Sequence, residues 1–120
     1  MSDYKELIAA YEVDVQIPDV SGMEQLDMLM TRSGIAQNEL HLSEEERKRV
    51  LNADRLLLQQ AMQFYESIQS IADLASWRRD ESVPATHWWW YLDVIVQLLI
   101  RSDLSIKSIE PSLELSPIGV

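Results

Sequence analysis

The most hydrophobic run of the chain, residues 86–101, has the polar pattern of a helix. At about 100° per residue, Asp93, Gln97 and Arg101 fall on one narrow arc, and nearly all of the remaining circumference is apolar. The run is too short to cross a membrane, which takes about 20 residues. We therefore predict a Trp-rich helix over residues 86–101 that other parts of the protein cover.

The preceding segment predicts a long helix over residues 43–80. It begins at Ser43 with a capping box, and acidic residues fill its first turn. No Gly or Pro follows until Pro84. Apolar residues recur on one face at spacings of three, four and seven: Val50, Leu57, Ala61, Phe64, Ile68, Ile71 and Ala75. A continuous helix over residues 44–79 would be about 54 Å long. Such a helix bends, or makes the molecule elongated, or lies along a second copy. The competing interpretation is a monomer whose long helix breaks near residues 67–70 and folds back as two shorter helices.

The first part of the chain predicts two short helices with a strand between them. One helix covers residues 3–11. The other covers residues 22–33, after a capping box at Ser21, and Gly34 is the residue expected to close it. Residues 11–17 alternate apolar and polar side chains, which is typical of a half-buried strand.

A strand at residues 11–17 needs a partner, and the other candidates lie in the C-terminal tail, residues 104–120. This tail has several serines, two prolines and spaced aliphatic residues, so we expect it to be extended. Its short alternating stretches favour a small two-stranded pairing of the two ends of the chain. An extended segment lying on the helices fits the pattern equally well.

These patterns together predict a mainly all-α fold, a helical bundle or hairpin of one long and one Trp-rich helix. Residues 1–103 form a single helical domain, and residues 104–120 form the extended tail. The domain consists of an acidic N-terminal part with short helices (1–42), the long helix (43–80) and the Trp-rich helix (86–101). The short link between the last two favours an antiparallel hairpin.

The chain is strongly acidic, with 20 acidic and 10 basic residues and a formal net charge of −10. Eleven of the acidic residues and only two of the basic residues lie within residues 1–46. This charge disfavours binding to nucleic acid or to an anionic membrane. The N-terminus lacks the basic-then-apolar order of a secretory signal, so we expect a cytoplasmic protein.

Few residues favour catalytic or metal chemistry. The chain has no cysteine, and its two histidines, His41 and His87, lack the spacing of a metal-binding motif. No nucleotide-binding or hydrolase motif is present. We therefore expect no catalytic residue, no metal and no cofactor, and we interpret the protein as a non-enzyme.

Asp54 is the candidate buried acid, because it falls within the apolar face of the predicted long helix. An unpaired carboxylate at such a position is costly, so Asp54 needs a partner. Arg101, Arg47 or a histidine could serve. The alternative interpretation is an acid that contacts a ligand.

Trp77, Trp90, Arg78 and Arg79 are the candidate interaction residues. Trp77 falls on the polar side of the predicted long helix, and tryptophan is enriched where partners dock. Trp90 falls among the polar residues of the Trp-rich helix, which favours a position at an interface or at the rim of a cleft. The two arginines lie close to Trp77 in the sequence.

The leading interpretation is a non-catalytic helical protein that self-associates, most simply as a two-fold homodimer, or that binds another protein. It depends on the argument that one chain has too few elements to cover two largely apolar helices. One alternative is an acidic mimic or inhibitor that covers a basic surface of a target protein. A third is a small-ligand-binding bundle with a Trp-lined pocket and Asp54 inside it.

Overall fold

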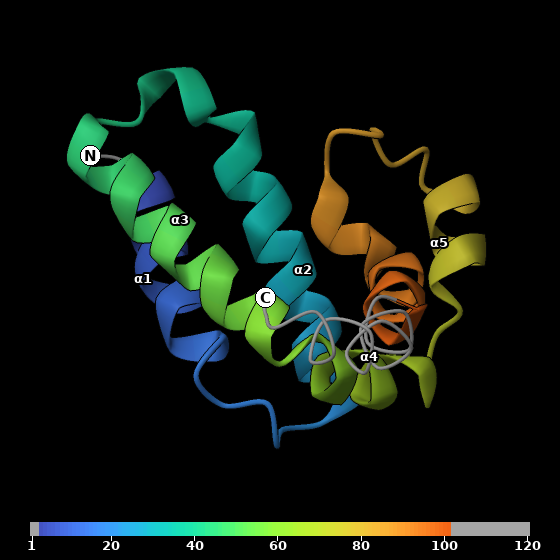
Figure 1. The fold of residues 1–120 in the computed structure, drawn as a ribbon. Helices are drawn as coiled ribbons and strands as arrows, with labels where there is room; N and C mark the ends of the chain where they lie inside the picture. Colours follow the sequence, from blue (N-terminus) through green and yellow to red (C-terminus); the bar gives the residue numbers. More distant parts are fainter. Residues whose placement is uncertain (1–2, 102–120) are drawn as a thin grey trace, which may run out of the picture.

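In the computed structural model of the protein, the structure of residues 3–101 is described, and this part is built from helices and their connections (Figure 1). The elements are α1 (Asp3–Asp14), α2 (Gly22–Gln37), the 3₁₀ helix η1 (Glu39–His41), α3 (Glu44–Gln59), α4 (Ala61–Gln69), α5 (Leu74–Asp80) and the 3₁₀ helix η2 (Trp88–Tyr91). Residues 92–101 continue from η2 as an α-helix. The predicted all-α class is confirmed, since no strand occurs within residues 3–101.

The helices form two neighbouring groups joined by α2 (Figure 1). In the first group, α1 packs against both α2 and α3, and α4 continues from α3 onto α2. In the second group, α5 contacts η2, and η2 also contacts α2. The largest buried apolar side chains come from both groups: Ile8, Tyr11, Met28, Leu29, Ile35, Leu57, Phe64, Ile68, Trp89 and Leu92.

The two predicted capping boxes are confirmed. At the start of α2, the backbone N–H of Glu24 donates to the Ser21 hydroxyl (3.3 Å), and the backbone N–H of Ser21 donates to the Glu24 carboxylate (3.4 Å). At the start of α3, Ser43 and Glu46 make the same reciprocal bonds at 3.1 and 2.8 Å. These motifs are local in sequence, so they form wherever the chain allows the helix.

The predicted continuous helix over residues 43–80 is wrong, because the segment folds as α3, α4 and α5. At the first break Gln60 has φ −118° and ψ 26°, and its N–H is shared among three carbonyls of the preceding turn. No Gly or Pro causes this break. The change of direction lets α3 pack on α1 while α4 packs on α2, so tertiary packing overrides the local helical pattern.

The second break agrees with the competing interpretation, in which the helix breaks near residues 67–70. There the Ser70 hydroxyl donates to the carbonyl of Ser67 (2.7 Å). Asp73 then caps α5, because its carboxylate accepts from the Ala75 backbone N–H (3.1 Å) and from the Ser76 hydroxyl (3.0 Å). The predicted hairpin of one long helix and the Trp-rich helix therefore does not form, because the long helix is divided.

The predicted strand over residues 11–17 is also wrong, since α1 and a following turn occupy that segment. Ile8, Tyr11 and Val15 are buried, and their spacing of three and four is that of a helix. The apolar positions in this segment fit the period of a strand and also that of a helix. The contacts of α1 with α2 and α3 favour the helix. The proposed partner of the strand, the tail at residues 104–120, lies outside the described residues.

Gly34 does not close α2, which continues to Gln37. Its role is a close helix contact, because a Cβ at Gly34 would lie 3.0 Å from Cδ1 of Leu7 in α1. Gly22 has a similar role at the other end of α2, where a Cβ would overlap the carbonyl oxygen of Ser67 in α4. Both positions lack a side chain where another helix approaches α2.

The helix predicted over residues 86–101 begins later than its pattern indicates. Thr86 lies in a turn and does not cap the helix, residues 88–91 form η2, and the α-helix covers residues 92–101. Trp90 lines a pocket between α2 and the segment that joins α5 to η2, but its ring is almost fully buried, at 3% exposed. The reason is tertiary, because Trp77 of α5 stacks on its ring.

The turn after α5 holds Ser82 in a left-handed conformation, with φ 51°. The Val83 backbone N–H donates to the carbonyl of Arg78 (3.1 Å), which is the bond of a Schellman turn, and glycine is preferred at the residue before Val83. We therefore expect Ser82→Gly to raise the free energy of unfolding, measured with urea, by about 0.5–1 kcal/mol. Ser76→Gly inside α5 is the control and should lower it by about 0.5–1 kcal/mol. An unchanged or lower stability of the Ser82 variant would contradict the prediction.

Candidate functional site

A buried ion pair joins the first three helices. Arg32 of α2 and Asp54 of α3 are each 8% exposed. Arg32 Nε donates to Asp54 Oδ1 (2.9 Å), and Arg32 Nη2 donates to Asp54 Oδ2 (3.0 Å). The hydroxyl of Tyr11 in α1 donates to the same Oδ1 (2.6 Å). The partners of Asp54 are therefore Arg32 and Tyr11, which corrects the expectation of Arg101, Arg47 or a histidine.

Aromatic rings pack against the planar guanidinium group of Arg32. Its Cζ lies 4.1 Å from the centroid of the Trp89 ring and 5.8 Å from that of Tyr11, within the range of cation–π contacts. Burial, followed by the charge of Asp54, raises the pKa of the Tyr11 hydroxyl well above its ordinary value. Tyr11 thus stays a hydrogen-bond donor, and the guanidinium is fixed in position by its edge and its face.

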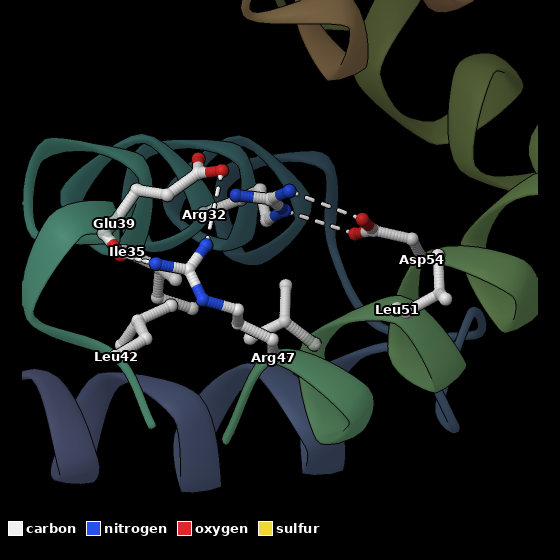
Figure 2. Close-up of a pocket in the computed structure, with 8 residues that line it drawn as sticks. Arg32, Ile35, Glu39, Leu42, Arg47, Leu51 and Asp54 are labelled. Atoms are coloured by element: carbon white, nitrogen blue, oxygen red, sulfur yellow. Dashed lines mark hydrogen bonds and ion pairs between the residues drawn. The ribbon is translucent and has the colours of Figure 1, made fainter. Parts of the chain in front are cut away.

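A pocket of about 230 Å³ opens beside this ion pair, between α2, η1 and α3 (Figure 2). Its apolar lining consists of Ile35, Leu42, Val50 and Leu51. Its charged lining consists of Arg32, Arg47, Glu39 and Asp54. The pocket therefore combines an aliphatic wall with two guanidinium groups, one of them buried and fixed.

Glu39 and Arg47 form the outer part of this pocket (Figure 2). Arg47 Nη2 donates to the backbone carbonyl of Glu39 (2.6 Å), and Arg47 Nη1 lies 3.5 Å from the Glu39 carboxylate. The side chains of Arg47 and Glu39 are 44% and 61% exposed, so this long ion pair contributes little to stability. The Glu39 carboxylate is free to move away from the guanidinium.

Ser33 is the centre of a second polar cluster, where η2 meets α2. Its Oγ accepts bonds from the indole N–H of Trp89 (3.0 Å) and of Trp90 (2.7 Å). It also lies 3.1 Å from Nδ1 of His87. Two indole donors occupy both lone pairs of the hydroxyl, so its proton is free to be donated to the imidazole. The neutral His87 ring then carries its own proton on Nε2.

The Ser33–His87 contact has the residue types of a nucleophilic pair, but its geometry is that of a structural cluster. Attack by Ser33 needs a lone pair, and both are engaged by Trp89 and Trp90. His87 stacks on the Trp89 ring, with 4.7 Å between centroids. Burial, with a smaller effect of the Arg32 charge, lowers the pKa of His87, which keeps the ring neutral at pH 7.

The candidate interaction residues Trp77, Trp90 and Arg78 lie in contacts within the chain. The Trp77 and Trp90 rings stack with centroids 5.6 Å apart and planes at 10°. Arg78 donates to the Trp90 carbonyl (2.8 Å) and makes two bonds to the Asp93 carboxylate (2.7 and 3.2 Å). Together these contacts attach α5 to η2. Arg79 is exposed and lies 3.8 Å from the carboxylate of its neighbour Asp80.

A second pocket, of about 350 Å³, lies between α2 and the segment that joins α5 to η2. Its lining includes Met30, Gln37, Trp77, Glu81, Pro84, His87 and Trp90. It corresponds in kind to the Trp-lined pocket of the third functional interpretation. Asp54 does not line it, so the structure does not bring the buried acid and the stacked tryptophans to one site.

The helix at residues 92–101 has an unusual apolar surface. Leu92 and Val96 face the core and are buried. Its exposed aliphatic side chains are Val94, Leu98, Leu99 and Ile100, which are 42%, 55%, 50% and 40% exposed. Large aliphatic side chains grouped on one short helix mark an interaction surface more often than isolated ones do.

Two residues that the sequence patterns did not single out hold these clusters together, namely Arg32 and Ser33. Arg32 follows Met28 and Leu29 and precedes Ile35 at spacings of three and four, so it lies on the buried face of α2. A buried arginine needs a carboxylate. That spacing, like that of Asp54, marks Arg32 as a buried charge that needs a partner, but only the packing of α2 on α3 makes the two residues each other's partners. Ser33 gives no comparable signal, because a serine inside a helix is usually solvated.

Within residues 3–101 there is no group of three or more His, Asp or Glu side chains placed to hold a metal ion. No helix of that part is long and apolar enough to cross a membrane. No protein-family model, no curated protein and no solved structure matches the chain. Function therefore has to be argued from the surfaces and clusters described above.

Proposed function

We propose that this is a non-catalytic helical interaction protein that self-associates, as a two-fold homodimer, through the helix at residues 92–101. The observation that carries the proposal is the group of exposed aliphatic side chains on that helix, of which Leu98 at 55% is the most exposed. Burying such side chains stabilises a complex by roughly 25 cal/mol for each Å² of apolar surface removed from water. Trp77 and Trp90 are not part of the contact, since they pack on each other.

A second copy of the helix is a suitable occupant because the surface is self-complementary. In a two-fold contact the same residues meet from both sides, so the helices run antiparallel. Val94 and Leu98 are exposed and lie one turn apart on the helix, so an antiparallel two-fold contact places Val94 of one copy opposite Leu98 of the other. The apolar surface is matched by this arrangement, and Asp93 keeps its bonds to Arg78 within each copy.

Each copy carries a formal net charge of −10, so the proposal predicts how salt changes the strength of self-association. Two copies repel each other through solvent, and salt screens that repulsion, while the apolar contact is little affected. Self-association should therefore become tighter as salt concentration rises. The acidic mimic predicts the opposite behaviour, namely binding to a basic target that weakens steeply with salt.

The test is the mass of the full chain by light scattering over a roughly hundredfold dilution at two salt concentrations. We expect about twice the chain mass of 13.9 kDa at high concentration and dissociation on dilution. Leu98→Asp should weaken the dimer by roughly a hundredfold or more, because it places two carboxylates in an apolar contact. Its melting temperature should stay close to that of the unchanged protein.

The matched control is Leu40→Asp, since Leu40 is 92% exposed but lies in η1, away from the proposed contact. That variant should dimerise normally. A constant monomer mass at high concentration and high salt would overturn the proposal. So would equal effects of the Leu98 and Leu40 substitutions on the dimer.

A further inference from the structure

We propose that the pocket between α2, η1 and α3 is a binding site for a small carboxylate that carries a short hydrocarbon chain. The carboxylate would bind between the guanidinium groups of Arg32 and Arg47, and the hydrocarbon would lie on the aliphatic wall of the pocket (Figure 2). This site is separate from the exposed helix at residues 92–101, so it does not depend on self-association.

The first step of the argument concerns the unused donors of Arg32. A guanidinium has five N–H bonds. Asp54 accepts two of them, from Nε and from Nη2. Nη1 has no acceptor among the described residues. Among the side chains of the described part, only Gln25 Oε1 is both fully buried and without a hydrogen-bond partner. Nη1 is therefore not fully buried, and Arg32 is one of the residues that line the pocket. In Figure 2 the Arg32 nitrogen without a dashed line is on the side of Glu39.

The second step is that Arg32 is rigid before any ligand arrives. Asp54 fixes one edge of the guanidinium, and the Trp89 ring covers its face at 4.1 Å. A donor that is already fixed loses little conformational freedom on binding. Asp54 neutralises the formal charge of Arg32, but it does not use the edge that faces the pocket. Arg47 supplies the mobile and exposed positive charge.

The third step is that Glu39 already occupies the position of a ligand carboxylate. Its carboxylate lies 3.5 Å from Arg47 Nη1, at the limit of a hydrogen bond, and the pair is largely exposed. Carboxylates bind arginine best through short bonds from two N–H groups at about 2.7–2.9 Å. In the structure Glu39 makes only the one long contact, whereas an external carboxylate is free to adopt the short two-bond geometry. Glu39 is thus a weak internal competitor.

The fourth step sets the size and kind of ligand. The pocket volume of about 230 Å³ is below the roughly 300 Å³ at which sites for drug-sized ligands begin. Its aliphatic wall gives no hydrogen bond to the far end of a ligand. A simple anion such as acetate or phosphate would leave that wall uncovered, whereas a chain of about four to eight carbon atoms would cover it.

The experiment is a titration of the full chain with hexanoate, followed by calorimetry and by the NMR signals of the arginine side chains. The comparison ligands are acetate, hexanol and hexylamine. Acetate lacks the hydrocarbon chain, hexanol lacks the charge, and hexylamine carries a positive charge in place of the negative one. We expect hexanoate to bind at least roughly tenfold more tightly than each of them. The Nη signals of Arg32 and Arg47 should shift on binding.

Two substitutions at the exposed pair make the result decisive. Arg47→Gln should weaken hexanoate binding by roughly tenfold or more, and Glu39→Gln should strengthen it severalfold by removing the internal competitor. A gain in affinity cannot arise from unfolding. Arg79→Gln, an exposed arginine far from the pocket, is the matched control and should bind like the unchanged protein.

Four results would overturn the proposal. The first is the absence of saturable hexanoate binding, and the second is binding of hexanol as tight as that of hexanoate. The third is equal hexanoate affinity in the Arg47, Glu39 and Arg79 variants. The fourth is hexanoate binding that these substitutions leave unchanged and that shifts only the NMR signals of residues outside α2, η1 and α3, because the ligand would then bind elsewhere.

Discussion

Replacing Asp54 with alanine is expected to lower the free energy of unfolding by about 3–5 kcal/mol, because Arg32 would remain buried without its counter-ion. Arg32 is 8% exposed and its two bonds to Asp54 are 2.9 and 3.0 Å long. The buried hydroxyl of Tyr11 would lose its acceptor as well. Urea unfolding at pH 7 measures this loss, read as a shift of the midpoint at constant slope.

The matched control is the exposed pair of Glu12 and Arg49, which also joins α1 to α3, at 2.6 Å. Their side chains are about one third exposed, so Glu12→Ala should cost only about 0–1 kcal/mol. A loss below about 1 kcal/mol for Asp54→Ala would contradict the importance of the buried pair. A loss equal in the two variants would show that burial does not distinguish them.

The buried pair also predicts a compensated variant. When both charges are replaced by apolar residues of similar volume, no charge is left unpaired, and such replacements are often neutral or stabilising. Arg32→Met with Asp54→Leu and Tyr11→Phe should therefore recover most of the loss caused by Asp54→Ala alone. Recovery would show that the cost of the single variant is the unpaired guanidinium, and that the pair itself is not a large net source of stability.

The ion pair illustrates which parts of the fold the sequence can predict. Ser43 and Glu46 lie three residues apart, so the pattern alone contains the whole interaction, and the helix start is confirmed. Arg32 and Asp54 lie 22 residues apart, and their pairing depends on how α2 and α3 cross. Each residue is recognisable as a polar group on an apolar face. Only the packing of the helices shows that they meet.

The break at Gln60 belongs to the same class of non-local effect. Residues on both sides of it keep a helical apolar spacing, and Leu57, Ala61 and Phe64 are all buried. The break therefore leaves no trace in the hydrophobic pattern. Its cause is that α1 and α2 lie in different directions from this segment. Apolar periodicity predicts which side of a helix is buried but not what covers it.

The run of tryptophans at residues 88–90 shows how far the sequence pattern could predict the candidate interaction residues. The 100° projection placed Trp90 among polar side chains, and its neighbour Asp93 does indeed lie near solvent. Trp90 is buried because α5 returns along η2 and stacks Trp77 on it. The same fold leaves Leu98 and its neighbours uncovered, which is why the proposed contact moves from the tryptophans to the end of this helix.

Ser33→Ala is expected to lower the free energy of unfolding by roughly 2–5 kcal/mol, which is a large effect for removing one hydroxyl. The Ser33 Oγ is the acceptor for the indole N–H groups of Trp89 and Trp90, which are 2% and 3% exposed. A buried donor that loses its acceptor costs about 1–3 kcal/mol, and this substitution leaves two such donors. Urea unfolding at pH 7.5, where the lowered pKa of His87 keeps the ring neutral, gives the value.

A double-mutant cycle separates the lost hydrogen bonds from a general weakening of α2. Trp89→Phe alone removes one indole donor, and in the Ser33→Ala background it also removes one of the two groups that would otherwise be left unpaired. The cost of Trp89→Phe should therefore be smaller in that background, with a coupling energy of about 1–2 kcal/mol. Ser70→Ala is the matched control, since its exposed hydroxyl bonds only the Ser67 carbonyl, and it should cost less than about 1 kcal/mol. Additive losses in the cycle would mean that Ser33 does not hold the indoles, and that the attachment of η2 to α2 depends on ring packing alone.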